Sequence, residues 1–350
     1  MVTHAPDRAP AQSDSGADGR RVRVFSGIQP SGNFHLGNYL GAIRNWVNQI
    51  ETSDSIFCVV DLHALSNNPE PDTLRHQIRN VAASLLASGL DPEACLLFVQ
   101  SDVPAHAELQ WLLNSVTQFG ELRRMTQFKD KSAGKGDSVS AAVFSYPVLM
   151  AADIILYDAE EVPVGDDQRQ HVELTRDIVQ RFNARYGETF VLPKADIKEE
   201  AARIMALDKP DEKMSKSSPR EASYVAFSDS PDVIRKKIRR AVTDSGETVT
   251  AGPGKPALTN LIQIYGSLTG MTTPQVEAHF EGKRYGDFKK ELAEVVVDHL
   301  APIQAELARL NDDPGFVAGV LERGAEQAND LASEKMRLVR ERIGIGRPRL

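Results

Sequence analysis

Two short segments, far apart in the sequence, carry residues suited to nucleotide chemistry. The first, at residues 29–38, reads QPSGNFHLGN and directly follows a β-rich run. Its glycines let the backbone approach a ligand, and Gly37 leaves room for an adenine or a ribose. We expect a helix to begin near Leu36 or Gly37, with unpaired N–H groups and a positive dipole end that suit phosphate. His35 and Asn38, three residues apart, can both face one side of that turn and donate hydrogen bonds to triphosphate oxygens.

The second segment, residues 213–217, reads KMSKS and is followed by Pro219, which prevents a helix from forming across it. Two lysines on such a hinge can close over a bound triphosphate. Their charge matters most when negative charge builds at the α-phosphate, so it stabilises the transition state more than the ground state. Taken alone, the first segment could be a plain strand–turn–helix and the second an exposed loop. Neither has the glycine spacing of a dehydrogenase dinucleotide site or of a phosphate-binding P-loop.

The elements that would position these segments alternate between strands and helices. Apolar runs predict strands, and apolar residues at helical spacing predict helices. In chain order they are a strand at 21–27, a helix at 41–50, a strand at 55–60, a helix at 72–88 and a strand at 95–99. This alternation indicates a parallel α/β sheet, whose ligands lie beyond the carboxyl ends of the strands.

The remainder of the chain is mainly helical. The patterns predict a helical stretch at 104–125, a helix at 139–157 kinked at Pro147, a short strand at 161–165, and helices at 167–186, 231–242, 258–268, 288–310 and 315–342. The α/β character fades near residue 205, which predicts a domain boundary there. Residues 1–20 are polar and lack the apolar stretch of a signal peptide, so we expect a disordered tail on a cytoplasmic protein.

The bulk composition is that of a soluble globular protein, with no apolar run near the ~20 residues of a membrane span. Cys58 and Cys95 both lie in apolar runs, which favours buried free thiols over a disulfide, and no Cys/His grouping has zinc-site spacing. The formal net charge of −8 argues against a general nucleic-acid coat. A basic run of five cations at 235–240 is either a solvated helix face or a face that contacts nucleic-acid phosphates.

Together the two segments resemble the signature motifs of class I aminoacyl-tRNA synthetases, with HLGN standing where that family has its HIGH motif. More narrowly, the chain resembles the bacterial tryptophanyl-tRNA synthetases from about residue 23 to 342. Further matching stretches are GELRRMTQFK at 120–129, YPVLMAAD at 146–153 and VPVGDDQ at 162–168. The tyrosyl enzymes are the nearest relatives, but they usually carry Asp-Pro-Thr where this chain has QPS at 29–31. One departure is Ser218, where the family often has Asp after the lysine motif.

The resemblance implies an α/β fold in two parts. A Rossmann-like parallel-sheet catalytic domain would span 21–207, with a helical, dimer-forming insertion around 104–130. A mainly α-helical C-terminal domain at 208–350 would carry the lysine loop and read the anticodon. The last helix is a candidate to pack back on the catalytic domain.

The resemblance also implies a reaction, that of a tryptophan–tRNA ligase. The carboxylate of L-tryptophan attacks the α-phosphate of ATP in line, pyrophosphate leaves, and the tryptophanyl-adenylate then acylates the terminal ribose of tRNA(Trp). Mg2+ should bridge the phosphates with few protein ligands, and no organic prosthetic group is needed. Because the attacking carboxylate is already ionised, positioning and charge stabilisation carry the catalysis. The implied assembly is a homodimer. The alternatives are a tyrosyl-tRNA ligase and a catalytically idle paralogue that binds tryptophan or RNA.

The site residues implied by the resemblance fall into three groups. The catalytic group is His35, Asn38, Lys131, Lys213 and Lys216. The ATP-binding group is Gln29, Pro30, Ser31, Gly37, Asn38, Gly165, Asp166, Asp167, Ile204, Lys213, Met214, Ser215, Lys216 and Ser217. The tryptophan-binding group is Phe25, Gln29, His63, Tyr146, Met150, Asp153, Val162, Val164 and Gln168.

Asp153 has the clearest chemical reason for its role. The only polar group of an indole is an N–H that donates, so a tryptophan pocket needs one fixed acceptor among apolar walls. Asp153 lies in an apolar helical run, where an unpaired charge is unfavourable, and a carboxylate gives a strong charge-assisted hydrogen bond. The alternative is an Asp satisfied within the fold, for example by an arginine. If a required hydrogen bond selects tryptophan, phenylalanine is rejected by a factor of about 10⁴ or more.

Overall fold

The computed structural model describes residues 20–32, 34–132, 139–197, 203–215 and 220–346, with only the backbone for 130–132. Its centre is one sheet of five parallel strands in the order β3-β2-β1-β4-β5. The strands are β1 (Arg23–Ile28), β2 (Asp54–Val59), β3 (Leu96–Val99), β4 (Glu161–Pro163) and β5 (Lys194–Asp196). The predicted parallel α/β sheet is therefore confirmed. Strand β5 was not predicted, because its three residues are largely polar and lie at a sheet edge.

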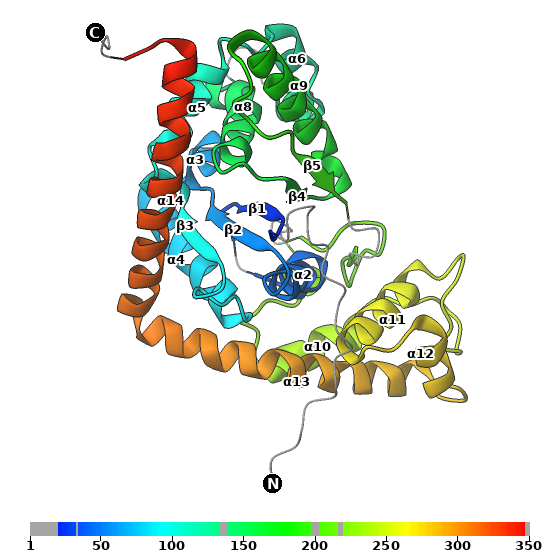
Figure 1. Cartoon of the computed structure of the whole chain (residues 1–350). Coiled ribbons are helices and arrows are strands. Elements are labelled where there is room, and N and C mark those ends of the chain that lie inside the picture. Colours follow the sequence, from blue (N-terminus) through cyan, green and yellow to red (C-terminus); the bar gives the residue numbers. More distant parts are fainter. Residues whose placement is uncertain (1–19, 33, 133–138, 198–202, 216–219, 347–350) are drawn as a thin grey trace.

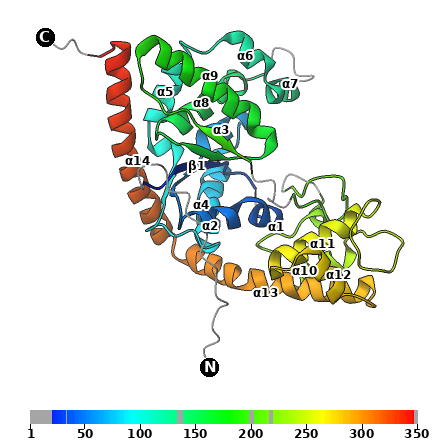
Figure 2. The same cartoon turned by 45° about the vertical axis from the view of Figure 1, so that its right-hand side comes forward.

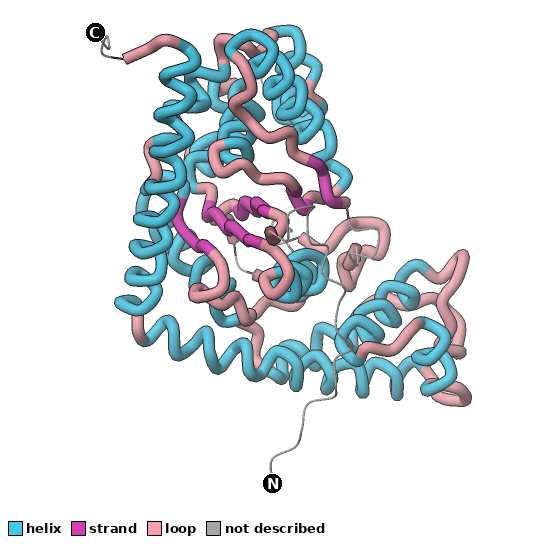
Figure 3. Tube along the Cα trace, in the orientation of Figure 1, coloured by secondary structure: helices cyan, strands magenta, loops and turns pink. Residues whose placement is uncertain are grey.

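Helices surround this sheet on both faces (Figure 3). After β1 the chain forms α1 (Leu36–Asn38), a π-helical turn (Tyr39–Ile43) and α2 (Arg44–Gln49). The remaining helices of the sheet region are α3 (Asp61–Ala64), α4 (Pro71–Ala87), α5 (Ala105–Leu113), α6 (Phe119–Arg124), α7 (Thr126–Ser132), α8 (Ala141–Ile155) and α9 (Arg169–Tyr186). Short 3-10 turns lie at Leu65–Asn67, Gln100–Asp102, Asp166–Gln168 and Glu221–Ser223. Just past the end of α4, Gly89 has a φ of +99°, which glycine adopts readily.

Side chains alternate between the two faces of the sheet along each buried strand. They contribute to two apolar clusters, one on each face. On one face, Phe57 and Val59 of β2 pack with residues of α2 and α4. On the other, Ile56 and Cys58 of the same strand pack with residues of α5, α8 and α9. Two-sided burial explains why the strands read as continuous apolar runs.

The strand order reverses at β1, because β2 and β3 lie on one side of β1 and β4 and β5 lie on the other. In sheets of this kind the crevice outside the carboxyl ends of the two strands at such a reversal is the usual ligand site. Residues 29–38 leave the carboxyl end of β1, and Gly165 follows the carboxyl end of the neighbouring β4. The two candidate nucleotide-binding stretches thus start at the same edge.

The C-terminal part is helical, comprising α10 (Pro231–Arg240), α11 (Pro256–Thr269), α12 (Thr273–His279), α13 (Tyr285–Asp312) and α14 (Pro314–Ile343). Figures 1 and 2 show α13 running from the cluster of α10, α11 and α12 to the sheet region, where α14 turns and follows β3. Gly324 lies where α14 meets β3. A Cβ added there would sit 1.9 Å from the carbonyl oxygen of Leu97, so only glycine allows this approach. Since β3 is the last strand at its end of the sheet, α14 covers an edge that would otherwise be open.

Candidate active site

The first motif forms the start of α1, and its two polar side chains cap that helix together. The Nδ1 atom of His35 accepts from the Asn38 N–H, and Oδ1 of Asn38 accepts from the His35 N–H, both at 3.3 Å. This reciprocal capping fixes both side chains relative to the backbone. The helix begins at Leu36 as predicted, but the Leu36 N–H is not available to phosphate, because it donates to the Val225 carbonyl at 2.9 Å.

The second motif touches the first. Of its residues, Lys213, Met214 and Ser215 are described, whereas the expected site residues Lys216 and Ser217 lie outside the described part of the chain. Met214 is only 2% exposed. A Cβ added to Gly37 would lie 3.2 Å from the Cβ of Met214 and 3.0 Å from Nδ1 of His35. Gly37 is therefore the contact point that lets the lysine loop lie directly on the first motif.

The lysine loop is also held at its base. Ile204 is buried and its carbonyl accepts from the Met214 N–H at 2.9 Å. Across the neck of the loop, Arg220 donates to Asp208 at 2.6 Å and to Glu212 at 2.9 Å. The expected catalytic Lys131 belongs to α7, but its side chain lies outside the described residues.

Asp153 of α8 is buried and accepts three hydrogen bonds. His63 meets its Oδ2 at 2.8 Å, while Gln100 and His106 meet its Oδ1 at 2.6 Å and 2.7 Å. The other ring nitrogen of His106 lies 2.8 Å from the hydroxyl of Tyr157. His63 comes from α3, which follows β2, and Gln100 from the turn that follows β3, while His106 lies on α5, Asp153 lies near the end of α8 and Tyr157 just after it. Carboxylate, amide and imidazole groups thus converge at the carboxyl end of the sheet.

The charge of Asp153 is fixed by this cluster. Burial by itself raises the pKa of the carboxyl, but the hydrogen bonds from His106 and His63 outweigh burial and lower its pKa to about 2. An ionised carboxylate only accepts, so Nδ1 of His106 donates to it. Because the folded pKa is below the usual 3.8, this ionisation stabilises the fold above about pH 4. That contribution is lost only as pH falls towards 2.

A carboxylate offers about four lone-pair positions. The three donors on Asp153 are His63, Gln100 and His106. Counted over the residues that the structure describes, one acceptor position remains for a further donor. The alternative drawn from the sequence is an Asp satisfied within the fold, and the structure does give Asp153 internal partners. These are two histidines and a glutamine rather than the arginine suggested as an example, since no arginine bonds Asp153 within the described residues.

Gln100, His106 and Tyr157 are residues that sequence reasoning missed. Two signals could have found them. Gln100 directly follows the apolar run of β3, at the edge where ligands bind. His106 is fully buried and lies on the apolar face of α5 with Leu109 and Leu113, where a polar side chain needs a buried partner.

The four apolar residues of the expected tryptophan-binding group belong to one cluster. Phe25 and Val162 are buried, and Met150 and Val164 are half-buried against them. The ring of Phe25 stacks on Tyr157, with centroids 6.0 Å apart and planes 9° apart. Phe25 therefore lies next to the Asp153 cluster, because Tyr157 also meets His106.

Three polar residues of the expected tryptophan-binding group, Tyr146, Gln168 and Gln29, are less tightly grouped. The hydroxyl of Tyr146 lies 2.7 Å from Nε2 of His171 and 2.9 Å from Oε1 of Gln127, and its ring meets that of His63 edge-on at 6.3 Å. Gln168 instead donates to Asp167 at 2.8 Å. The side chain of Gln29 is exposed.

One part of the expected ATP-binding group, residues 165–167, follows β4. Gly165 lies against Asp167, where an added Cβ would come within 2.7 Å of the carboxylate oxygen Oδ1. Asp166 is exposed and pairs with Arg169 at 3.0 Å. After β1, Pro30 is buried and the Ser31 N–H turns back to the Gln29 carbonyl at 2.9 Å.

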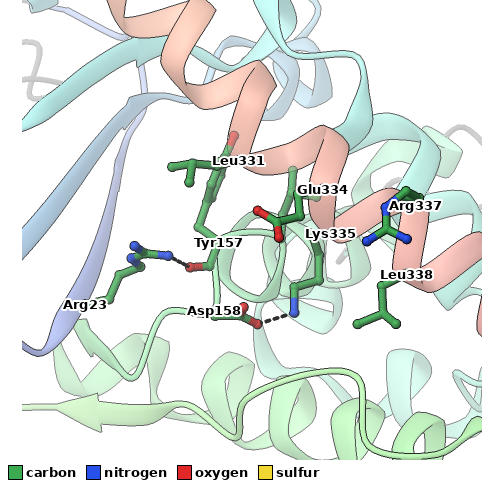
Figure 4. Close-up of a pocket in the computed structure, with 9 residues that line it drawn as sticks. Arg23, Tyr157, Asp158, Leu331, Glu334, Lys335, Arg337 and Leu338 are labelled. Atoms are coloured by element: carbon green, nitrogen blue, oxygen red, sulfur yellow. Dashed lines mark hydrogen bonds and ion pairs between the residues drawn. The ribbon is translucent and has the colours of Figure 1, made fainter. Parts of the chain in front are cut away.

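A cavity of about 230 Å³ lies elsewhere, between the start of β1, the end of α8 and α14 (Figure 4). Three of its charged groups are already engaged, since Arg23 donates to the Tyr157 carbonyl at 3.0 Å and Lys335 pairs with Asp158 at 2.6 Å. Among the residues that the structure describes, no group of three or more His, Cys, Asp or Glu side chains is arranged to hold a metal ion. None of the described helices is long and apolar enough to cross a membrane.

The sequence of this chain matches a known protein family and several of its members. The family model for "tRNA synthetases class I (W and Y)" matches residues 17–301. Tryptophan–tRNA ligase 2 of Streptomyces avermitilis is 50% identical over 328 residues, covering 93% of this chain and 97% of that protein. Tryptophan–tRNA ligase of Bacillus anthracis is 49% identical over 327 residues, covering 93% and 99%.

Solved structures give the same match. The tryptophanyl-tRNA synthetase of Mycoplasma pneumoniae superposes with a TM-score of 0.84 at 35% identity, over 93% of this chain and 98% of that one. The Campylobacter jejuni enzyme, solved in complex with ADP and tryptophan, gives a TM-score of 0.81 at 36% identity, over 93% and 100%.

Proposed function

The chain belongs to the class I tRNA synthetases of the tryptophan and tyrosine group, and we propose that it is a tryptophan–tRNA ligase. It activates L-tryptophan with ATP and transfers the amino acid to tRNA(Trp). Relatives about half identical over nearly the whole chain carry this activity in their names, and one similar structure holds ADP and tryptophan. The observation that carries the choice of tryptophan is the buried, ionised Asp153 with one acceptor position left over.

Asp153 suits an indole because that ring has one polar group, a donor. We propose that the indole N–H takes the fourth lone-pair position of the carboxylate, with Phe25, Met150, Val162 and Val164 as walls. The three resident donors keep the carboxylate from turning, so the acceptor points in a fixed direction. A phenylalanine would leave that position unpaired, which a site of this kind rejects by about 10⁴-fold or more.

We propose that ATP binds and reacts where the two motifs meet. His35 and Asn38 at the start of α1, with Gly37 between them, form a surface for the triphosphate, and the lysine loop lies on it through Met214. Lys213 and Lys216, with Lys131, supply positive charge as the α-phosphate is attacked. Mg2+ enters with ATP as part of the substrate and bridges its phosphates. No enzyme nucleophile is required, so catalysis is positioning plus charge stabilisation.

The test of the function is ATP–pyrophosphate exchange across a panel of amino acids. We expect exchange that depends on tryptophan and is at least about 10⁴-fold weaker with phenylalanine. Exchange preferring tyrosine would make the protein a tyrosyl-tRNA ligase. Absence of exchange with every amino acid, together with tryptophan or RNA binding, would make it an idle paralogue.

The partner tRNA is proposed to contact α10. Of the five cations in its basic run, Arg235 is paired with Glu294 at 2.8 Å and Lys237 with Asp229 at 2.6 Å. The other three, Lys236, Arg239 and Arg240, are exposed. Their spacing of three and four residues puts them on one face of the helix, where they can reach phosphates. We propose that residues 208–350 act as the helical part that holds the tRNA while the sheet region carries out activation.

Replacing Lys236, Arg239 and Arg240 together with alanine should weaken tRNA binding and leave exchange without tRNA unchanged. The logarithm of the tRNA association constant falls as the logarithm of salt concentration rises. Each lost phosphate contact makes this negative slope shallower by roughly 0.7–0.9. The measurement is the tRNA KM in aminoacylation at several salt concentrations. The matched control removes Arg323 and Arg337, exposed cations on α14. An unchanged tRNA KM in the α10 variant would make that run a solvated face.

The helical insertion is proposed as a homodimer interface. Its helices expose Trp111 and Phe119, which are 74% and 68% accessible. Phe119 also lies beside Phe144, with ring centroids 4.9 Å apart, so apolar surface extends from α6 to α8. Apolar patches of this kind usually mark contacts with another protein.

Changing Trp111 and Phe119 to glutamate should therefore convert a dimer into a monomer. Light scattering should give twice 38.4 kDa for the natural chain and 38.4 kDa for the variant. Phe316→Glu, at another partly exposed aromatic on α14, serves as the control and should stay dimeric. A natural chain that is monomeric at micromolar concentration would contradict the proposed interface.

A further inference from the structure

Asn260 of α11 holds the backbone beside the lysine loop with its side-chain amide. Its Oδ1 accepts from the Met205 N–H at 2.8 Å, and its Nδ2 donates to the Met205 carbonyl at 3.0 Å. Both ends of one side chain are thus bonded to both polar groups of a single residue. Asn260 is 3% exposed, so water does not compete for these bonds.

Met205 lies directly opposite Lys213 in a short antiparallel bridge. The flanking bonds run from the Met214 N–H to the Ile204 carbonyl and from the Ala206 N–H to the Glu212 carbonyl, both at 2.9 Å. In this pattern Met205 and Lys213 are a non-hydrogen-bonded pair, so the polar groups of Met205 point away from Lys213. The amide of Asn260 takes the place on that outer side where a third strand would bond.

We propose that Asn260 is a positioning residue for amino-acid activation, an inference that rests on the proposed function. Through Met205 it fixes the start of the lysine loop relative to α11. The other anchor of the loop, Met214 against Gly37, fixes it relative to the first motif. Two anchors on two elements define where Lys213 lies when ATP is bound.

The residue type matches this role. Only an amide presents a donor and an acceptor side by side in one plane. Aspartate at this position would accept from the Met205 N–H but would face the Met205 carbonyl with a second acceptor. Leucine, close in volume, would leave the buried N–H and carbonyl of Met205 without a partner. Because unpaired buried backbone groups are unfavourable, the backbone at Met205 would shift.

The geometry predicts which kinetic constant changes. The lysine charge acts mainly in the transition state, so a displaced loop lowers kcat for activation. A shift of about 1 Å in a positioning contact lowers the rate on the order of 10²-fold. The expected tryptophan-binding residues lie on or shortly after β1, β4, α3 and α8 and not on α11, so tryptophan affinity should not change.

The experiment compares Asn260→Leu, Asn260→Asp and Asn260→Gln in the full chain. Steady-state exchange gives kcat and the ATP KM, and equilibrium dialysis with labelled tryptophan gives its Kd. The control is Asn329→Leu on α14, whose amide also bonds main-chain carbonyls, those of Asp102 and Ala325, at 2.9 Å. We expect kcat to fall about 10²-fold in the leucine and aspartate variants. The tryptophan Kd should stay within about twofold, and the glutamine variant should recover part of the rate.

Each outcome decides the matter. Unchanged kcat in Asn260→Leu overturns the inference, and so does a parallel loss of tryptophan binding and kcat, which indicates general damage to the fold. A similar fall in kcat for Asn329→Leu also overturns it. If the natural chain shows no tryptophan-dependent exchange, the proposed function fails. If the natural chain is active and its Asn260 variants are equally active, only the inference about Asn260 fails.

Discussion

Replacing Asp153 with asparagine is expected to lower tryptophan-dependent exchange by about 10²- to 10³-fold. Truncating one partner in a buried, charged hydrogen-bond network costs about 2–5 kcal/mol. Asparagine is not a neutral replacement here. It has one acceptor oxygen and a donor group, whereas both oxygens of Asp153 accept from His63, Gln100 and His106. One orientation of the amide turns its NH2 towards His63 and the other turns it towards Gln100 and His106, so resident donors face a donor in either case.

An analogue of tryptophan with sulfur in place of the ring N–H separates recognition from general damage. The benzothienyl analogue has nearly the same shape but cannot donate to Asp153. The natural chain should prefer tryptophan over it by about 10⁴-fold, and Asp153→Asn should lose most of that preference. A preference that survives the substitution would assign indole recognition to another acceptor.

The second large effect is expected at Gly324, where even alanine should destabilise the fold. The added methyl would lie 1.9 Å from the Leu97 carbonyl oxygen, and the atom in its way belongs to a strand rather than to a flexible side chain. Helix α14 would have to move off β3. Overpacking of this kind costs about 3 kcal/mol, and we expect Tm to fall by roughly 5–10 °C.

A matched control lies on the same helix. The nearest atom to a Cβ added at Gly319 is 3.5 Å away, on Arg323, an ordinary contact. Gly319→Ala should therefore raise stability by about 0.5–1 kcal/mol through helix propensity. Thermal unfolding of the two variants measures the difference. Equal Tm values would mean that α14 does not rest on β3 as closely as described.

Much of the sheet could be predicted because its strands are buried on both faces. Residues 55–60 and 95–99 are apolar runs too short for helices, and they became β2 and β3. Strand β5 has no such pattern, since Lys194 and Asp196 lie at an edge. Helix α12 was also missed, because only Val276 is buried among its seven residues.

The candidate site was predictable by residue type but not by contact. The sequence marks Asp153 as a charge in an apolar helix, yet its partners His63, Gln100 and His106 come from other elements. No periodicity relates Gly37 to Met214, because their contact depends on how two distant loops fold together. Asn260 gave no signal either, since a lone asparagine in a helix is ordinary until its partner is known.

The position of α14 has a consequence for how the protein is made. The bond from Asn329 to the Asp102 carbonyl joins residues 227 apart in sequence. While the ribosome is still adding the C-terminal helices, β3 has already emerged but has nothing to cover it. Such nascent chains expose a pairing-competent strand that can associate with other chains. Slow synthesis of the last helices would therefore prolong an aggregation-prone interval, during which a chaperone bound over β3 would protect the growing polypeptide.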